Sequence, residues 1–193
     1  MKVIKFIARL LMHLLFKIEI KGLENIPSTD GVIIAPNHIS NWDPVIVIGF
    51  FKHPIKIMAK AELFKNFIFK AFFTFVGAFP INRGDADITA IKTAMRFLKN
   101  DEKLLVFPHG TRLKPEDDIS VKEGVILIAL KARKNIVPAY ISGNYRLGSK
   151  IILSYGEPFD LSPYYTQKLT PDDVKALADE LWSKMKELKE VTN

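Results

Sequence analysis

The sequence contains no cysteine, which excludes disulfide bonds and metal sites built on thiolates. It also lacks any linker, internal repeat or low-complexity segment that would divide the chain, so its 193 residues predict a single sizeable core. The apolar N-terminal segment has no uncharged run near the roughly 20 residues that a bilayer-spanning helix needs. Charges also interrupt this segment where a cleavable signal peptide would be continuous, and no small-residue cleavage site follows.

What the sequence has instead is a high share of hydrophobic residues, 48%, together with a formal net charge of +7. This combination favours an anionic membrane surface as a partner. Nucleic acid is not expected as a partner, because the lysines and arginines are spread along the chain. The aromatic residues also lie in apolar stretches rather than between basic residues.

Residues 1–16 predict an amphipathic helix that is distinct from the rest of the chain. Its basic residues recur every three or four positions and form one stripe: Lys2, Lys5, Arg9 and His13. We interpret the segment as an interfacial anchor, with the cations at lipid headgroups and the apolar face at the acyl boundary. The alternative is a helix packed on the core of its own domain.

Residues 17–193 alternate short apolar runs with amphipathic segments, which predicts one α/β domain. We expect a mixed, mostly parallel central sheet of about seven strands, flanked by helices. The expected strands lie at residues 18–20, 32–35, 55–59, 77–81, 104–107, 136–141 and 151–155. Asp43 is the expected N-cap of one helix, residues 120–123 have the pattern of a capping box that opens another, and the last begins near Pro171.

The pair His38 and Asp43 is the strongest chemical signal, because it follows a buried strand and precedes a helix. Positions five apart point about 140° away from each other on a helix, so the two side chains meet only if residues 39–41 turn. A carboxylate bonded to one imidazole nitrogen fixes the tautomer and prepares the other nitrogen to take a proton. The pattern therefore indicates a general base, with the alternative that both residues only cap the strand and the helix.

His38 and Asp43 match the NHxxxxD block of the glycerolipid acyltransferases, a family that the chain resembles over roughly residues 17 to 156. Three further blocks of that family follow in order: Gly77–Arg83, Phe107–Arg112, which resembles FPEGTR, and Ile136–Ala139. The segments Met58–Phe64 and Lys122–Gly124 also resemble linking segments of the family.

The resemblance implies acyl transfer from an acyl thioester to the free hydroxyl of 1-acyl-glycerol 3-phosphate, giving phosphatidic acid. His38 would act as the general base oriented by Asp43, without a covalent intermediate. No cofactor is expected; the partners would be the lysophospholipid acceptor and a thioester of coenzyme A or of acyl carrier protein. The expected location is peripheral or monotopic, on the cytoplasmic face of a membrane.

Several residues are candidates for binding the substrates. Guanidinium groups match phosphate oxygens in a bidentate way, which makes Arg112 and Arg83 the expected phosphate ligands. Lys60 and Lys122 would add weaker point charges, and ion pairs on the surface are the alternative for each cation. The backbone of Gly110 and Thr111 could stabilise the oxyanion.

His109 stands where the third block of the family usually has glutamate, which leaves the identity of the acceptor open. It could give a hydrogen bond or a positive charge to a phosphate. A metal shared by His109 and His38 is not expected, because no cluster with a recognisable ligand spacing surrounds them.

Six phenylalanines lie between Phe64 and Phe75. Core packing is the favoured interpretation for any single one, and a second membrane contact or the wall of an acyl-chain groove is the alternative. Other functions remain open as well. The acceptor could be glycerol 3-phosphate or another lysolipid, or the protein could be a membrane-surface phosphoesterase or a non-catalytic membrane-binding module.

Overall fold

The computed structural model describes residues 2–82, 87–114 and 117–190, which form one α/β domain. The first half contains α1 (Lys2–Leu15), β1 (Lys17–Lys21), η1 (Leu23–Asn25), β2 (Ile33–Pro36), α2 (Asp43–Phe50), β3 (Ile55–Lys60), η2 (Ala61–Phe64) and α3 (Phe67–Phe75). The second half contains β4 (Ala78–Ile81), α4 (Ile88–Lys99), β5 (Lys103–Leu105), α5 (Gly124–Ala132), β6 (Ile136–Gly143), β7 (Lys150–Tyr155), η3 (Ser162–Tyr164) and α6 (Pro171–Glu190).

The seven strands of the described residues form one sheet in the order β1-β7-β6-β2-β5-β3-β4. All neighbouring strands are parallel except β6 and β7, which form an antiparallel pair. The prediction of a mixed, mostly parallel sheet of about seven strands is therefore confirmed. Central strands such as β2 are buried on both faces, which explains why they are continuous apolar runs in the sequence.

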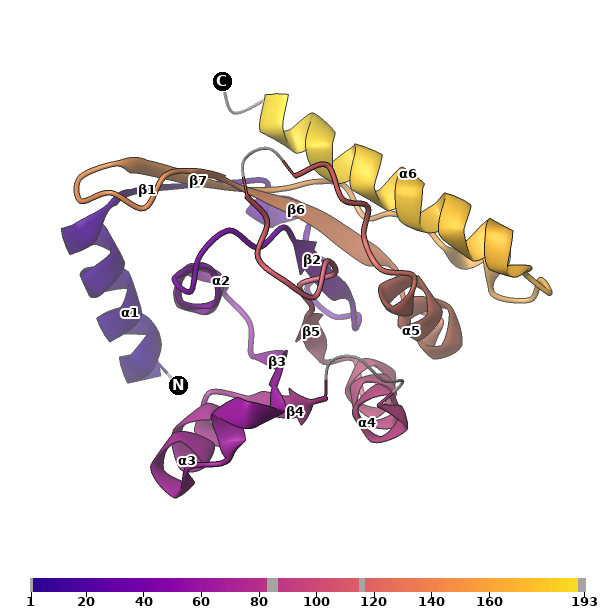
Figure 1. Cartoon of the computed structure of the whole chain (residues 1–193), viewed down its shortest axis with the longest axis horizontal. Helices are drawn as coiled ribbons and strands as arrows, with labels where there is room; N and C mark the ends of the chain where they lie inside the picture. The colour runs from indigo at the N-terminus through magenta and orange to yellow at the C-terminus, as the bar shows by residue number, and fades with distance from the viewer. Residues whose placement is uncertain (1, 83–86, 115–116, 191–193) are drawn as a thin grey trace.

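Helices cover both faces of the sheet (Figure 1). Alternate residues of β2 point to opposite faces: Ile33 packs in the core beneath α4, α5 and α6, whereas Ile34 packs in the core beneath α1 and α2. The carboxyl ends of the parallel strands β2, β3 and β5 meet at one edge of the sheet, where ligands of open α/β sheets bind.

Two predicted helix starts differ from the structure. Trp42, not Asp43, is the N-cap of α2, because the Asp43 carboxylate accepts hydrogen bonds from the preceding loop instead. Residues 120–123 do not form a capping box: α5 begins at Gly124, and its N-cap Glu123 makes no side-chain capping bond. The Ser120 hydroxyl instead donates to Asp179 of α6, at 2.5 Å, so tertiary contact overrides the local pattern.

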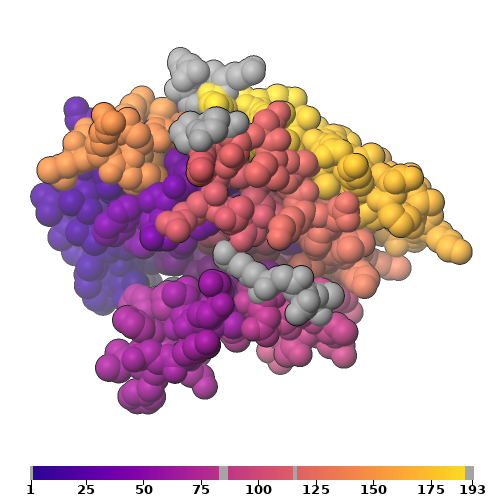
Figure 2. Space-filling view, in the orientation of Figure 1, coloured from indigo at the N-terminus to yellow at the C-terminus, as the bar shows by residue number. Residues whose placement is uncertain are grey.

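The phenylalanine-rich segment matches its favoured interpretation only in part, because Phe64 and Phe73 pack against the core beneath α1 and α2 whereas its other phenylalanines are exposed. No residue of α3 is buried, and Phe67 is 83% exposed. The exposed phenylalanines of α3 are Phe67, Phe69, Phe72 and Phe75. The helix forms because Asn66 caps it, accepting hydrogen bonds from the N–H groups of Ile68 and Phe69. Figure 2 shows the magenta segment around α3 as a lobe that projects from the body of the molecule.

The N-terminal helix α1 is docked on α2 through its polar side, by two of the cations that the sequence predicts to meet lipid headgroups. Lys5 Nζ donates to the carbonyl oxygens of Phe51 and His53, at 2.7 and 2.8 Å, and Arg9 Nε donates to Gly49, at 2.5 Å. These carbonyls lie at or just beyond the C-terminus of α2, where a helix leaves acceptors unpaired and its dipole favours cations. Lys5 and Arg9 therefore donate to the protein's own backbone, with Lys5 partly buried and Arg9 still exposed.

The apolar face of α1 consequently points away from the domain. Its exposed large side chains are Val3, Phe6, Ile7, Leu10, Leu11 and Leu14. Met12 is the one buried residue of the helix. Within the described ranges, no helix is both long and apolar enough to cross a membrane.

Candidate active site

Two loops at the carboxyl ends of β2 and β5 build the candidate site. Asn37 is fully buried and fixes the first loop to β6: its Nδ2 donates to the Ile141 carbonyl at 3.0 Å, and its Oδ1 accepts from the Ile141 N–H at 2.6 Å. The backbone N–H of Leu113 donates to the His38 carbonyl at 2.7 Å, which joins the second loop to the first. The two blocks of sequence, about 70 positions apart, are thus held together by backbone hydrogen bonds.

The structure brings His38 and Asp43 into contact, with 2.7 Å between His38 Nδ1 and Asp43 Oδ2. The N–H groups of Ile39 and Ser40 donate to the same carboxylate oxygen, at 2.7 and 2.8 Å, because residues 39–41 turn as expected. The Asp43 side chain is fully buried and that of His38 is 12% exposed. Since the carboxylate accepts from Nδ1–H, the other ring nitrogen, Nε2, is the one available as a base.

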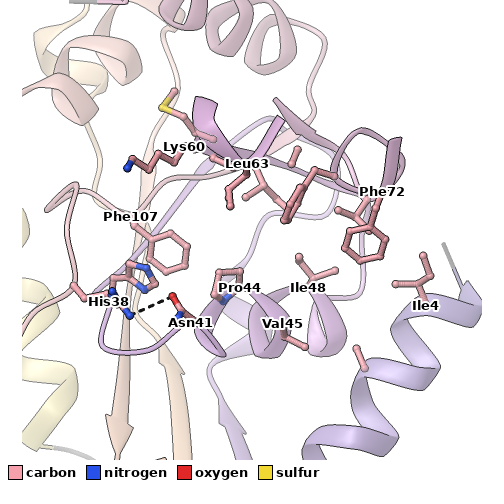
Figure 3. Close-up of a pocket in the computed structure, with 18 of the residues that line it drawn as sticks. Ile4, His38, Asn41, Pro44, Val45, Ile48, Lys60, Leu63, Phe72 and Phe107 are labelled. Atoms are coloured by element: carbon pink, nitrogen blue, oxygen red, sulfur yellow. Dashed lines mark hydrogen bonds between the residues drawn. The ribbon is translucent and has the colours of Figure 1, made fainter. Parts of the chain in front are cut away.

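Phe107 holds the His38 ring from one side. The two rings are stacked, with their centroids 4.2 Å apart and their planes 29° apart (Figure 3). With Nδ1 bonded to Asp43 and one face covered, the imidazole has a fixed orientation toward the adjoining cavity.

A cavity of about 910 Å³ adjoins His38. Its polar end is lined by His38, Asn41, Lys60, Thr111 and Arg112, whereas its walls toward α1, α2 and α3 are apolar. Figure 3 shows His38 and Lys60 on one side of this cavity and Ile4 and Phe72 on the other. The cavity therefore combines a base, two cations and an apolar channel that leads toward the exposed helices α1 and α3.

The predicted phosphate ligands are only partly placed. Arg112 lines the cavity, and its Nη1 donates to Asn41 Oδ1 at 3.3 Å. Within the described ranges Arg112 makes no ion pair, so the surface-pair alternative has no support there. Lys60 also lines the cavity but lies 3.2 Å from Glu62 in a half-exposed pair. Arg83 lies outside the described residues.

Gly110 has a positive φ of 72°, which explains the glycine in this turn. A Cβ at this position would lie 3.1 Å from Lys122 Nζ, so Lys122 rests over the turn and does not line the cavity. The Gly110 N–H donates to the Phe107 carbonyl at 3.1 Å. This N–H is therefore used by the turn, and the expectation that it faces an oxyanion is not supported.

His109 points away from the cavity, toward α6. It is 3% exposed and lies edge-on to Trp182, with the ring centroids 4.7 Å apart. Neither ring nitrogen has a hydrogen-bond partner of good geometry among the described residues. Burial lowers the pKa of His109 to about 4; the Ile119 carbonyl opposes this shift and the nearby His38 adds to it. His109 is thus a neutral packing residue, and the structure does not bring it to a substrate phosphate.

Sequence reasoning missed Tyr145, whose hydroxyl donates to Asp43 Oδ1. It is 102 positions from Asp43 and lies in the turn between β6 and β7, so no local pattern could indicate the contact. Phe107 and Asn37 belong to the recognised blocks, but their roles depend on contacts between strands. No group of three or more metal-ligating side chains occurs in the part of the chain that the structure describes.

Comparisons with known proteins agree with this arrangement. The sequence model of the family described as Acyltransferase matches residues 17–142. The chain is 31% identical over 179 residues to the 1-acyl-sn-glycerol-3-phosphate acyltransferase of Bacillus subtilis, which covers 89% of this chain and 87% of that protein. It is 32% identical over 179 residues to the protein of the same name from Streptococcus pneumoniae, covering 88% and 65% respectively.

A structural relative shares the fold. The crystal structure of the 1-acyl-sn-glycerophosphate (LPA) acyltransferase PlsC from Thermotoga maritima superposes with a TM-score of 0.77, covering 99% of this chain and 79% of that chain. The sequence identity between the two is 23%. The likeness therefore extends over the described helices and strands on both faces of the sheet.

Proposed function

This chain belongs to the acyltransferase family, and we propose that it transfers an acyl group from a thioester to the free hydroxyl of 1-acyl-glycerol 3-phosphate. The observation that carries the proposal is the cavity itself. It brings together an imidazole held by a buried carboxylate and the Arg112 guanidinium, which has no carboxylate partner among the described residues, at the end of an apolar channel. The product is phosphatidic acid.

His38 acts as the general base in this reaction. Its Nε2 takes the proton from the acceptor hydroxyl while the hydroxyl oxygen attacks the thioester carbonyl carbon. The tetrahedral intermediate then collapses, the carbon–sulfur bond breaks, and the proton on His38 passes to the leaving thiolate. The buried Asp43 stabilises the imidazolium between these two steps, as carboxylates do in other His-carboxylate pairs.

The rest of the cavity binds and orients the two substrates. The Arg112 guanidinium, which lines the cavity, binds the acceptor phosphate, and Lys60 adds a point charge. The apolar walls formed by α2 and α3 fit acyl chains, which would otherwise lie in water. Fixing both substrates next to His38 supplies the proximity part of the rate acceleration.

We also propose that the protein acts at the cytoplasmic face of a membrane, where coenzyme A and acyl-carrier-protein thioesters are both present. The exposed apolar faces of α1 and α3 flank the cavity and offer a contact surface for lipid. Because Lys5 and Arg9 are used within the protein, this contact rests on apolar burial more than on attraction to anionic headgroups.

The defining experiment supplies the purified protein, in vesicles, with lysophosphatidic acid, glycerol 3-phosphate or lysophosphatidylcholine. Each is paired with the coenzyme A or the carrier-protein thioester, and products are identified by mass. We expect acylated product from lysophosphatidic acid. Product from another acceptor alone would change the assigned substrate, and release of inorganic phosphate would indicate a phosphoesterase.

Two variants test the assigned roles. His38→Ala should lower kcat by about 10²- to 10⁴-fold, and His53→Gln is the matched control at another histidine. Arg112→Ala should mainly raise the KM of the acceptor, while Arg96→Ala, an exposed arginine of α4, should not. Full activity of His38→Ala, or an unchanged acceptor KM in Arg112→Ala, would contradict the corresponding role.

A further inference from the structure

Tyr145 completes the hydrogen bonding of the Asp43 carboxylate. Asp43 Oδ2 accepts from His38 and from the N–H groups of Ile39 and Ser40. Asp43 Oδ1 accepts from the Tyr145 hydroxyl, its one partner among the described residues. With donors on both oxygens the carboxylate cannot rotate freely, so the direction of the bond to His38 is fixed.

The Tyr145 hydroxyl is a permanent donor. Burial first, and then the adjacent Asp43 charge, raise the pKa of Tyr145 well above its usual range. The hydroxyl therefore stays protonated at neutral pH, and it does not compete with His38 for the role of base. Tyr145 does not line the cavity, so it has no direct contact with a bound substrate.

The end of α1 holds the Tyr145 ring in place. Phe16 lies edge-on to it, with centroids 5.3 Å apart and planes at 89°, and also lies edge-on to Trp42, the N-cap of α2. Backbone hydrogen bonds join the same parts of the chain: Gly148 N–H donates to Leu15, and Lys17 N–H donates to Ser149, both at 2.8 Å. The turn that carries Tyr145 is thus bonded directly to the residues at the end of α1.

We propose that Tyr145 is a positioning residue that aligns Asp43 and, through it, His38, and that Phe16 at the end of α1 sets the position of Tyr145. The inference rests on the proposed acyl transfer, since it assigns Tyr145 a role in the same site. It also gives α1 a part in catalysis besides that of a contact surface: the helix holds a residue that orients the general base.

The first test is Tyr145→Phe, which keeps the ring and removes only the hydroxyl. We expect kcat to fall about tenfold, with the KM of acceptor and donor unchanged, because one hydrogen bond to a charged group is lost. The acid limb of the pH–rate profile should move to higher pH, because Asp43, with one donor fewer, stabilises the imidazolium more strongly. The matched control is Tyr165→Phe, which removes a hydroxyl that donates to Asn135 at 2.8 Å, remote from the site.

A second readout does not depend on activity. The Nδ1 proton of His38, assigned by its absence in His38→Gln, should give a downfield NMR signal whose position changes in Tyr145→Phe and not in Tyr165→Phe. An unchanged signal in Tyr145→Phe would overturn the positioning role. If the wild-type protein transfers no acyl group but Tyr145→Phe still shifts this signal, the proposed function is contradicted. The positioning of His38 through Tyr145 is then still supported.

The link to α1 is tested with Phe16→Leu, alone and combined with Tyr145→Phe. Phe16→Leu alone should lower kcat by a few-fold, because the Tyr145 ring loses its edge contact. If Phe16 acts through the hydroxyl, the same substitution made in Tyr145→Phe should have no further effect on kcat. If the decreases in kcat of the two single variants multiply in the double variant, Phe16 does not act through Tyr145 and this part of the proposal is overturned. The melting temperatures of all variants report any damage to the fold.

Discussion

The first and last helices of the chain have the same kind of amphipathic pattern and opposite orientations. The apolar stripe of α6 packs against the sheet, where Leu181 and Met185 are fully buried. The apolar stripe of α1 faces outward, where Leu14 is 77% exposed, while its cations pair with the end of α2. The comparison teaches that periodicity identifies an apolar face, whereas the neighbouring elements decide whether that face points to the core.

The largest expected effect is a difference in the free energy of unfolding between matched substitutions in α6 and α1. Leu181→Ala in α6 should lower the free energy of unfolding by about 2 to 5 kcal/mol, because it leaves a cavity in a closed core. Leu14→Ala in α1 removes the same atoms from an exposed position and should change it by less than about 0.5 kcal/mol. Urea denaturation measures both values, and equal losses would mean that the apolar face of α1 is covered in solution.

The next effect concerns lipid. Phe67→Ser in α3 removes a ring that is 83% exposed, and it should weaken binding to vesicles by about 2 kcal/mol, or roughly 30-fold. The stability of the domain should not change, because Phe67 makes no contribution to either core. Sedimentation with vesicles measures the binding.

Varying the salt concentration and the lipid charge tests whether apolar or basic side chains carry vesicle binding. If the apolar faces of α1 and α3 carry the contact, raising the ionic strength should change vesicle binding little. A steep loss of binding with salt, or binding confined to anionic vesicles, would mean that basic side chains carry the membrane contact, as the sequence pattern predicts.

Much of the fold could be predicted because its signals are local. Runs of β-branched apolar residues predict the central strands. The spacing of His38 and Asp43 requires a turn between them, and this correctly predicts their contact beside the end of β2. Two of the family blocks form loops at the cavity because each follows a strand that ends at the same edge of the sheet: the first block follows β2 and the third follows β5. The second and fourth blocks instead contain β4 and the first half of β6.

What could not be predicted depends on partners distant in sequence. Ser120 has a capping pattern but bonds to Asp179, and Asp43 turns away from capping because four donors surround it. Histidine is a residue type that often binds ligands, but His109 lies in the environment of a core residue, because Trp182 of α6 covers it. In each case a contact between elements replaces the local preference, and no spacing within one segment encodes it.

The buried His109, which packs against α6, should make the stability of the protein depend on pH. An unfolded histidine binds its proton below about pH 6.5, whereas the pKa of His109 in the folded state is about 4. Between these values the unfolded state binds more protons, so stability should fall as the pH falls, by about 3 kcal/mol in total at about 1.4 kcal/mol per pKa unit. His109→Phe should flatten this dependence, measured by urea denaturation at a series of pH values; an unchanged slope would place the titration elsewhere.

The smallest expected effect compares the two cores through one hydroxyl each. Tyr155 of β7 lies in the core beneath α1 and α2, and its hydroxyl has no hydrogen-bond partner among the described residues. Tyr155→Phe should therefore raise the free energy of unfolding by about 1 kcal/mol, because an unpaired polar group leaves the interior. Tyr165 packs against the core beneath α6 and donates to Asn135, so Tyr165→Phe should lower it by a similar amount. Opposite signs in thermal denaturation would show that the Tyr155 hydroxyl is an unpaired polar group in the core beside α1, whereas a loss in both variants would mean that the Tyr155 hydroxyl is hydrogen-bonded in solution.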